Sequence, residues 1–292
     1  MNNTMDGKTV LITGASGGIG LEAASELAGM GANVVMVARD RTRGESAVSR
    51  VRNDTASERV ELLLADIGSL DDIRRLAREF KSTHQRLDVL LNNAGAYHST
   101  RKLTKDGFEM TFGVNHLGYF LLTELLRDAL VASAPSRIIN VSSAAHVGGK
   151  IDFDDLMGER SYQGRRAYGQ SKLANVLHAY ELARQFDGTG VTANALHPGV
   201  VATGFGKNND GALGTLFGVA QIIGKPFYIS PARGAETSIY LASSPEVEGV
   251  TGKYFVKKKA VPSNERSYDV ESQQRLWEVS AQLTRATAPA TA

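Results

Sequence analysis

The chain of 292 residues contains no cysteine. This excludes disulfide bonds, thiolate metal sites and cysteine nucleophiles, and it suits the reducing cytoplasm, where we expect the protein to work. An excess of one charge sign is also missing, because 33 lysines and arginines stand against 31 acidic residues, a formal net charge of +2. The basic residues are spread along the chain, so we expect no nucleic-acid-binding surface.

Long apolar runs are absent as well. No stretch of about 20 apolar residues occurs, so the sequence predicts no membrane-spanning helix, and its first residues lack the apolar core of a signal peptide. The six histidines show no metal-binding spacing. No serine lies in a Gly-x-Ser-x-Gly turn. We therefore expect neither a metal centre nor a serine hydrolase.

Short apolar runs alternate with stretches of helical apolar spacing along the whole chain. Because the runs are continuous, both of their faces should be buried beneath helices. The pattern predicts an α/β fold: one doubly wound, Rossmann-type domain with a parallel seven-stranded sheet and helices on both faces. The expected strands are Thr9–Thr13, Asn33–Val37, Val60–Leu64, Leu87–Asn92, Arg137–Ser142, Thr192–His197 and Lys253–Val256, and the expected helices include Ile19–Met30, Ser69–Lys81, Gly107–Leu130 and Arg166–Phe186.

No repeat, linker or shift in composition divides the chain, so residues 1–292 are expected to form a single domain with its core in 5–283. Two long segments interrupt the alternation, Ala144–Arg165 and Gly204–Ser230. The second is rich in glycine yet apolar, which favours a substrate lid, although a surface helical excursion would show the same pattern. The tail 284–292 is small and polar, and we expect it to be disordered. The one basic run, Lys257-Lys258-Lys259, is expected to be a solvated turn.

A glycine-rich segment, Thr13-Gly-Ala-Ser-Gly-Gly-Ile-Gly20, follows the first expected strand and opens a helix. Glycines there let the backbone approach a pyrophosphate, and the helix N-terminus supplies amides and partial positive charge. This context predicts dinucleotide binding. The expected contacts are Gly14, Ser16, Gly18, Ile19 and Gly20.

The end of the second strand should distinguish between cofactors. An acidic residue there accepts bonds from the 2′-hydroxyl of the adenosine ribose, whereas a basic residue attracts a 2′-phosphate. Ala38 is neutral, Arg39 is the first charged residue, and Arg43 lies a turn further on, which favours NADP(H) over NAD(H). Asp40 could hold the ribose instead, but its position favours capping the helix that begins at Arg41.

Polar residues end the other expected strands. Asp66 could hold the adenine amino group or cap the helix that starts near Ser69. Asn115 interrupts an apolar helix, and a buried amide needs partners, so we expect a functional role for it. Ser142 and Ser143 end the fifth strand at the edge where ligands bind in this architecture. Cofactor contacts are also expected from Asp66, Ile67, Asn93, Ala94 and Gly95.

Tyr168 and Lys172 are four positions apart, one turn from each other on a helix face. An ammonium that close favours the phenolate and would lower the tyrosine pKa from about 10 toward neutrality. Tyrosine would then be a usable acid or base. Such a pair arises often by chance, and only its place after a nucleotide-binding half gives it meaning.

These motifs together resemble the short-chain dehydrogenase/reductase family over nearly the whole chain, from Lys8 to Leu283. The resemblance rests on the glycine-rich turn, Asn92-Asn-Ala-Gly95, the serine pair, Tyr168-Gly-Gln-Ser-Lys172 and His197-Pro-Gly-Val-Val-Ala-Thr203. The retinol-dehydrogenase-like branch is the most similar, on the long insert before Tyr168, Arg137–His146, Ser171–Asn175 and Gly252–Phe255.

The resemblance implies a catalytic tetrad. Tyr168 would act as acid/base, Lys172 as its electrostatic and ribose-binding partner, Ser143 would orient the carbonyl, and Asn115 would hold a relay water. It also implies that Pro198, Val200 and Thr203 lie near the nicotinamide carboxamide. The helices Gly107–Leu130 and Arg166–Phe186 would pair with their copies in a homodimer or homotetramer.

The sequence therefore predicts an NADP(H)-dependent oxidoreductase that interconverts a carbonyl and an alcohol. No arginine lies between Thr203 and Ser230, so a clamp for an anionic substrate is not expected, and the substrate should be a mostly apolar small molecule. Two alternatives stay open: reduction of a conjugated C=C bond by the same tyrosine, and a dinucleotide-binding sensor without turnover. The complete tetrad argues against the sensor.

Overall fold

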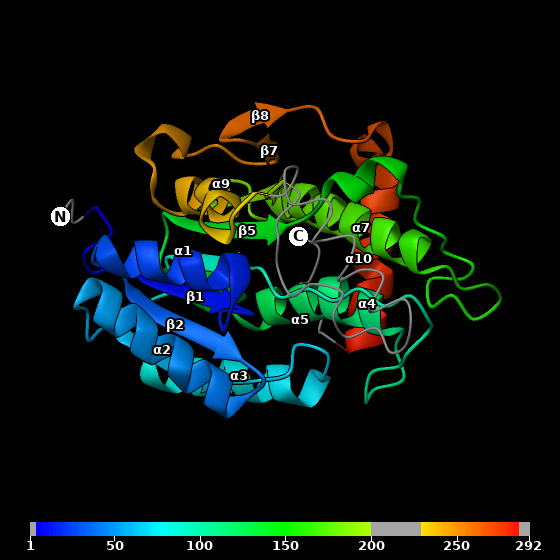
Figure 1. Ribbon diagram of the computed structural model, residues 1–292. Coiled ribbons are helices and arrows are strands. Elements are labelled where there is room, and N and C mark those ends of the chain that lie inside the picture. Colours follow the sequence, from blue (N-terminus) through cyan, green and yellow to red (C-terminus); the bar gives the residue numbers. More distant parts are fainter. Residues whose placement is uncertain (1–3, 200–228, 286–292) are drawn as a thin grey trace.

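The computed structural model describes residues 4–199 and 229–285. A central sheet has the strand order β3-β2-β1-β4-β5-β6-β7-β8, with helices on both sides (Figure 1). The strands β1 to β7 are parallel. From β1 the chain adds β2 and β3 on one side of that strand, then crosses back and adds β4 and the later strands on the other side. The strands are β1 Thr9–Thr13, β2 Asn33–Ala38, β3 Val60–Leu64, β4 Val89–Asn92, β5 Ser136–Val141, β6 Val191–His197, β7 Tyr254–Val256 and β8 Lys259–Val261.

The doubly wound parallel sheet is confirmed, and each of the seven expected strands is present. The eighth strand was not predicted. It pairs antiparallel with β7 through the turn Lys257-Lys258, whose two residues both have positive φ, 48° and 65°. Hairpin turns of that kind are usually signalled by Asn-Gly or Asp-Gly. The lysine run carries no such signal, although its first two residues do form the expected turn.

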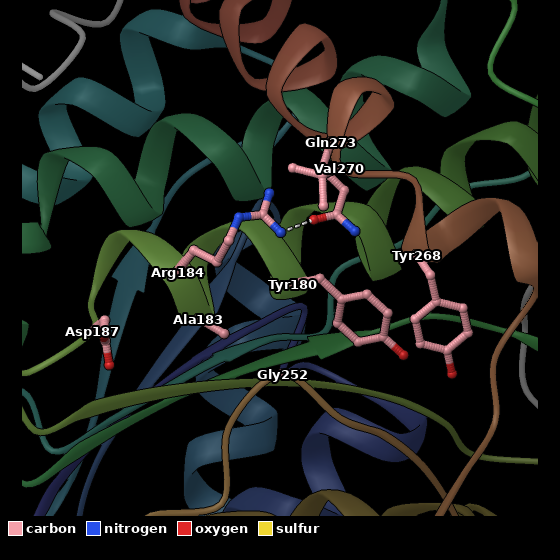
Figure 2. Close-up of a pocket in the computed structure, with 8 residues that line it drawn as sticks. All are labelled: Tyr180, Ala183, Arg184, Asp187, Gly252, Tyr268, Val270 and Gln273. Atoms are coloured by element: carbon pink, nitrogen blue, oxygen red, sulfur yellow. Dashed lines mark hydrogen bonds between the residues drawn. The ribbon is translucent and has the colours of Figure 1, made fainter.

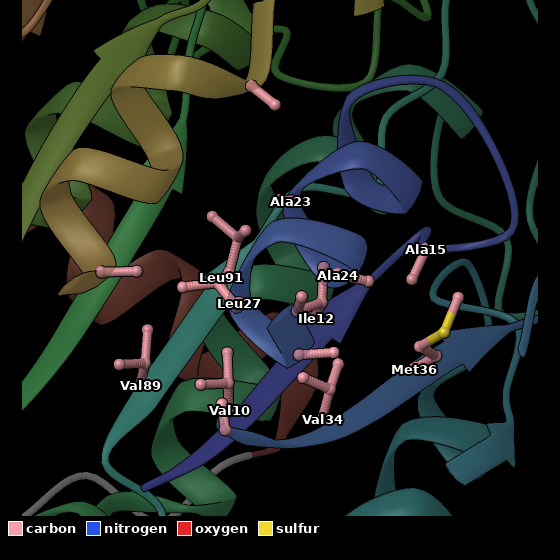
Figure 3. Packing of buried hydrophobic residues seen from close by; sticks show 14 of the residues in the cluster. Val10, Ile12, Ala15, Ala23, Ala24, Leu27, Val34, Met36, Val89 and Leu91 are labelled. Carbon is pink, nitrogen blue, oxygen red and sulfur yellow. The ribbon is translucent and has the colours of Figure 1, made fainter. Parts of the chain in front are cut away.

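Alternate residues of each strand serve the two faces of the sheet. Val10 and Ile12 of β1 pack with Leu27 of α1 on one face (Figure 3). Leu11 between them packs with Phe80 on the opposite face. The helices α1, α2 and α9 cover the first face, and α3, α5 and α7 cover the second. The helices are α1 Gly18–Gly29, α2 Arg41–Thr55, α3 Leu70–Thr83, α4 Met110–Phe112, α5 Gly118–Leu125, α6 Arg127–Ala132, α7 Gly164–Gln185, α9 Pro231–Ser243 and α10 Val270–Thr284.

The single helix expected over Gly107–Leu130 is wrong in its boundaries and continuity. It begins only at Met110, because the Glu109 carboxylate caps it by accepting from the amides of the next turn. The stretch Gly113–Leu117, which contains Asn115, then widens into a π-helical turn. Such turns are rare and occur frequently at functional sites. Helical periodicity cannot predict one, since apolar spacing barely changes over a single wide turn.

Helix α10 packs on α5 and α7, where a second copy of the chain was expected. The Trp277 ring lies 4.8 Å from that of Phe120 and 5.8 Å from that of His178. Leu276 packs with Leu173 and Leu177 of α7. The apolar character that suggested a partner therefore has its cover within one chain. An interface through the part of α5 and α7 that α10 covers would have to displace α10, and the oligomeric state itself stays a prediction.

The expected tail begins slightly too early. Thr284 is still the last residue of α10, it is fully buried, and its carbonyl accepts a hydrogen bond from Arg74 at 2.7 Å. Of the expected lid, residues 204–228 lie outside the described part of the chain. Ser230, at the lid's end, caps α9 by accepting from the Arg233 amide at 3.2 Å. Within the described ranges no helix has the length and apolarity needed to cross a membrane.

Candidate active site

The glycine-rich turn packs directly on the turn that follows β4. Gly14 has φ +67°, and a Cβ there would lie 2.9 Å from the Ala94 Cα. A Cβ on Gly20 would lie 2.6 Å from the Asn93 amide nitrogen. Both positions leave space only for hydrogen, so the glycine-rich turn, called the cradle below, packs closely on the turn after β4. Such a cradle at a helix N-terminus fits a pyrophosphate. Ser16, Gly18 and Ile19 lie in the same turn.

Hydrogen bonds lock these two turns together. Thr13 Oγ1 accepts from the backbone amides of Asn93 and Ala94 at 2.9 Å and 3.0 Å. In return, the Asn93 side chain donates to the Thr13 carbonyl at 2.8 Å. The sequence predicted contacts for Asn93 and Ala94 but assigned none to Thr13. Its place as the last residue of β1 was the only available signal.

Arg39 and Arg43 both lie at the carboxyl end of β2 and the start of α2. The Arg43 guanidinium comes within 3.9 Å of the Cβ position of Gly17 in the glycine-rich turn. No ion pair or hydrogen bond of either guanidinium occurs within the described part of the chain. Arg41 between them, by contrast, pairs with Glu45 at 3.3 Å. The Arg43 guanidinium beside the cradle fits a phosphate group.

The sequence left two roles open for Asp40, and the structure shows one of them. Its Oδ1 accepts from the Arg43 amide at 2.8 Å, which makes Asp40 the N-cap of α2, as expected. Of the two roles left open for Asp66, capping of the next helix is not the one observed. Ser69 caps α3, and Asp66 Oδ1 accepts instead from the Gly68 amide at 2.9 Å. A contact between Asp66 and adenine stays a prediction, as does that of Ile67, which packs beside Gly118.

Three members of the expected tetrad meet where the carboxyl end of β5 lies against the first turns of α7. Ser143 hydrogen bonds to the side chain of Tyr168. The Lys172 Nζ lies 5.7 Å from the centre of the Tyr168 ring and donates to the Val141 carbonyl at 3.0 Å. Ser142 is turned away, since its hydroxyl donates to the Lys172 carbonyl at 2.6 Å and ties β5 to α7. Of the serine pair, only Ser143 therefore reaches the tyrosine.

Asn115, the fourth member, is held by protein atoms. Its Oδ1 accepts from the Ala96 amide at 2.7 Å, and its Nδ2 donates to the Ala96 carbonyl and to Ser171 Oγ, at 3.0 Å and 2.9 Å. The π turn thus connects the loop after β4 to α7, next to Lys172. Both amide hydrogens are used in these contacts, so a relay water at Asn115 stays a prediction. Pro198 follows β6 at the same edge, and Val200 and Thr203 lie outside the described residues.

Comparison with known proteins identifies the family. A profile of the short chain dehydrogenase family matches residues 8–212. The chain belongs to this family. It is 48% identical over 292 residues to human retinol dehydrogenase 13, covering 98% of this chain and 87% of that one. It is 45% identical over 289 residues to human retinol dehydrogenase 14, covering 94% and 86%. These relatives place it in the retinol-dehydrogenase-like branch.

Solved structures agree with this assignment. A crystal structure of an uncharacterized protein from Mycobacterium paratuberculosis is 34% identical, with a TM-score of 0.78 over 97% of this chain and 96% of that one. An active-site complex of Pseudomonas aeruginosa RhlG with NADP is 25% identical, with a TM-score of 0.68 over 87% of this chain and 96% of the other. The chain is thus an oxidoreductase of a family that uses dinucleotide cofactors.

The electrostatics of this family site differ from the sequence expectation. Burial raises the pKa of Tyr168 to about 12, and the hydrogen bond with Ser143 opposes that rise. Burial also lowers the pKa of Lys172 to about 7. Lys172 Nζ donates to the Val141 carbonyl, and desolvation is the dominant influence on the pKa of Tyr168. The expected fall of the tyrosine pKa is therefore wrong for the arrangement in this structure, and Tyr168 is protonated at neutral pH.

Two tyrosines beside the tetrad were missed. The Tyr97 ring lies 5.8 Å from that of Tyr168 and nearly perpendicular to it, at 86°. The Tyr119 hydroxyl donates to the Ala94 carbonyl at 2.7 Å, and its ring faces Lys172 Nζ at 6.0 Å. Each follows a motif that was recognised, Asn92–Gly95 and Asn115 respectively. Periodicity gave no reason to separate either from ordinary apolar packing.

A surface pocket of about 590 Å³ lies elsewhere, between α7 and the start of α10 (Figure 2). Arg184 donates to Gln273 across it. None of the expected site residues lines this pocket. Its lining consists of Tyr180, Ala183, Arg184, Asp187, Gly252, Tyr268, Val270 and Gln273.

Replacing Gly14 by alanine tests whether the cradle depends on close approach. Gly7 is the matched control, because it has a similar φ of +71° but no neighbour within 4 Å of a Cβ. A left-handed alanine costs about 1–2 kcal/mol, so both variants should lose that much unfolding free energy in urea. Gly14→Ala should lose more, and only it should weaken NADPH binding measured by fluorescence. Equal losses in both variants would show that the Ala94 contact is unimportant.

Proposed function

We propose that the chain is an NADP(H)-dependent oxidoreductase that interconverts a carbonyl and an alcohol on a mostly apolar small molecule. The observation that carries the proposal is the Ser143–Tyr168 contact, with Lys172 beside it, at the sheet edge that also holds the glycine cradle. A nucleotide stretched from the cradle along this edge would end near that contact. The absence of a side chain at Gly14 and Gly20 supports the fit of its pyrophosphate.

When bound, NADPH supplies the hydride that reduces the carbonyl carbon. Tyr168 Oη donates the proton that the carbonyl oxygen needs, and a pKa of about 12 keeps that proton in place until the oxygen becomes basic. Ser143 lies within hydrogen-bonding reach of the same hydroxyl and can orient the carbonyl oxygen. In the oxidative direction the base would be the phenolate form of Tyr168, which accepts the proton of the alcohol, and Lys172 in its charged form would favour that phenolate.

The first test is Tyr168→Phe, which removes the acid but keeps the ring. We expect kcat for carbonyl reduction to fall by far more than tenfold, a loss above about 1.4 kcal/mol, with NADPH affinity nearly unchanged. Tyr97→Phe is the matched control, because it removes a hydroxyl from the ring packed against Tyr168 and should keep most of the rate. Retention of more than a tenth of the rate by Tyr168→Phe would exclude the proposed role.

The substrate assay must also separate carbonyl reduction from reduction of a conjugated C=C bond. We suggest following NADPH oxidation across ketones, aldehydes, quinones and enones, with products identified. A saturated ketone formed from an enone would support the C=C alternative. Tight NADPH binding without turnover of any compound would support the sensor.

The preference for NADP(H) rests on Arg39 and Arg43. Hydrogen bonds to charged groups contribute about 1.5–3 kcal/mol. Arg43→Ala should therefore lower kcat/KM for NADPH by about ten- to a hundredfold and leave kcat/KM for NADH little changed. Arg39→Asp should weaken NADPH and improve NADH. Arg41→Ala is the control, because its guanidinium is paired with Glu45. Equal efficiency of the wild type with both cofactors would refute this preference.

The apolar substrate is supported by three features. The Tyr97 ring packs beside Tyr168, no arginine lies between Thr203 and Ser230, and the relatives are named for retinol. Burying a methylene contributes up to about 0.8 kcal/mol. We therefore expect kcat/KM to rise along a homologous series of aliphatic aldehydes or ketones. A flat trend, or a preference for small charged keto acids, would contradict this prediction.

A further inference from the structure

A line of buried polar groups leads from Lys172 toward α10. Asn175 lies one turn after Lys172 on α7 and is fully buried. Its Nδ2 donates to the Val141 carbonyl at 3.2 Å, the same carbonyl that holds Lys172 Nζ at 3.0 Å. A carbonyl can only accept, so the amide orientation of Asn175 is determined. Its Oδ1 is left facing the interior, with no hydrogen-bond partner within the described ranges.

His116 lies on the other side of this amide. It follows Asn115 in the π turn, is almost completely buried, and its Nε2 lies 2.8 Å from Ser280 Oγ of α10. Its Nδ1, like Asn175 Oδ1, has no partner that meets hydrogen-bond geometry in the described chain. Burial lowers the pKa of His116 to about 3, and a hydrogen-bonding contact with the Asn175 side chain opposes that fall. The ring is therefore neutral and lies against Asn175.

Only one tautomer of His116 satisfies both groups. If Nε2 carried the hydrogen, Nδ1 and Asn175 Oδ1 would be two buried acceptors facing each other without a donor, which is costly. If Nδ1 carries it, His116 donates to Asn175, and the Ser280 hydroxyl donates to Nε2. In the structure that hydroxyl donates to the Leu276 carbonyl at 2.7 Å. Its single hydrogen would have to turn from this carbonyl to Nε2, which costs little because a helix carbonyl also accepts from a backbone amide.

We propose that His116 carries its hydrogen on Nδ1 and, through Asn175, fixes the Val141 carbonyl that anchors Lys172. His116 and Asn175 are then positioning residues for the lysine, and this part rests on the proposed function. The path Ser280–His116–Asn175–Val141–Lys172 connects α10 and the π turn to the catalytic helix. It gives the π turn a second role, because Asn115 holds the loop after β4 while His116 holds the lysine.

His178 provides an internal comparison. It is equally buried on α7, and its ring lies 5.7 Å from that of His116 and perpendicular to it. The Asn140 Oδ1 accepts from Asn92 at 3.0 Å, so its Nδ2 must be the group that faces His178 Nδ1 at 3.2 Å. His178 Nδ1 is thus an acceptor, and the hydrogen of this ring lies on Nε2. Two neighbouring buried histidines should therefore have opposite tautomers.

Nuclear magnetic resonance of the full chain tests the tautomers without any assay of activity. Long-range proton–nitrogen correlations of ¹⁵N-labelled histidine rings distinguish hydrogen on Nδ1 from hydrogen on Nε2, and His116→Gln and His178→Gln assign the signals. We expect Nδ1–H for His116 and Nε2–H for His178. Hydrogen on Nε2 of His116 would overturn the proposal. This outcome is independent of whether the enzyme reduces any carbonyl compound.

Kinetic variants test the effect on Lys172. Asn175→Leu and His116→Leu should each lower kcat by about tenfold, because a slightly misplaced catalytic group is costly, while KM for the carbonyl compound stays nearly constant. His116→Gln can still donate to Asn175 and should recover most of the rate. In Asn175→Leu the His116 hydrogen should move to Nε2.

His178→Leu is the matched control, because it removes an equally buried histidine that is outside the path. An equal loss of kcat in His178→Leu and His116→Leu would show a packing effect and refute the positioning role. If the leucine variants do not fold, the wild-type spectrum still tests the tautomer, and the rate of His116→Gln still tests the positioning role. A lack of turnover in every assay would instead count against the proposed function and leave the tautomer result standing.

Discussion

The site depends on one contact, the direct packing of the turn after β1 on the turn after β4. Gly14 meets Ala94 with no room for a side chain, and Thr13 and Asn93 exchange hydrogen bonds across the junction. This contact lies where the strand order reverses, which is where open α/β sheets bind their ligands. It sets the spacing between the nucleotide cradle and the loop that Asn115 then joins to α7. The residues of the proposed tetrad are thus positioned relative to the cradle by close backbone packing at Gly14 and by the polar side chains of Thr13, Asn93 and Asn115.

Burial within α7 governs the chemistry of the pair that it carries. Lys172 is almost completely buried, and its only close partner described is a neutral carbonyl, so its charged form is disfavoured. Tyr168 keeps its proton for the same reason. A protonated Tyr168 is what the proposed carbonyl reduction requires. Helix α10 covers the following turns of α7 and the π turn, through contacts of Trp277 with His178 and of Ser280 with His116.

Several parts of this arrangement could not have been predicted from local pattern. The π turn changes the direction of Asn115 and His116 without changing apolar spacing. The packing of α10 over α5 and α7 joins segments far apart in the chain, and apolarity alone could not distinguish it from a partner subunit. The pKa values depend on desolvation, which depends on everything that surrounds α7. The roles of Thr13, Tyr97 and Asn175 arise from contacts between turns and helices that no motif spacing records.

The sequence by itself determined the strand succession and the parallel sheet, and it singled out the glycine-rich turn and the candidate residues of the tetrad, because each of these depends on local periodicity or on residue types at short spacing. Asp40 as a helix cap belongs to the same class, since capping involves only the next turn. Only the tertiary structure decided which serine reaches Tyr168, where Lys172 points and what covers α7. These are outcomes of packing between distant segments, where burial and the few available hydrogen-bond partners select one arrangement from several that the local sequence allows.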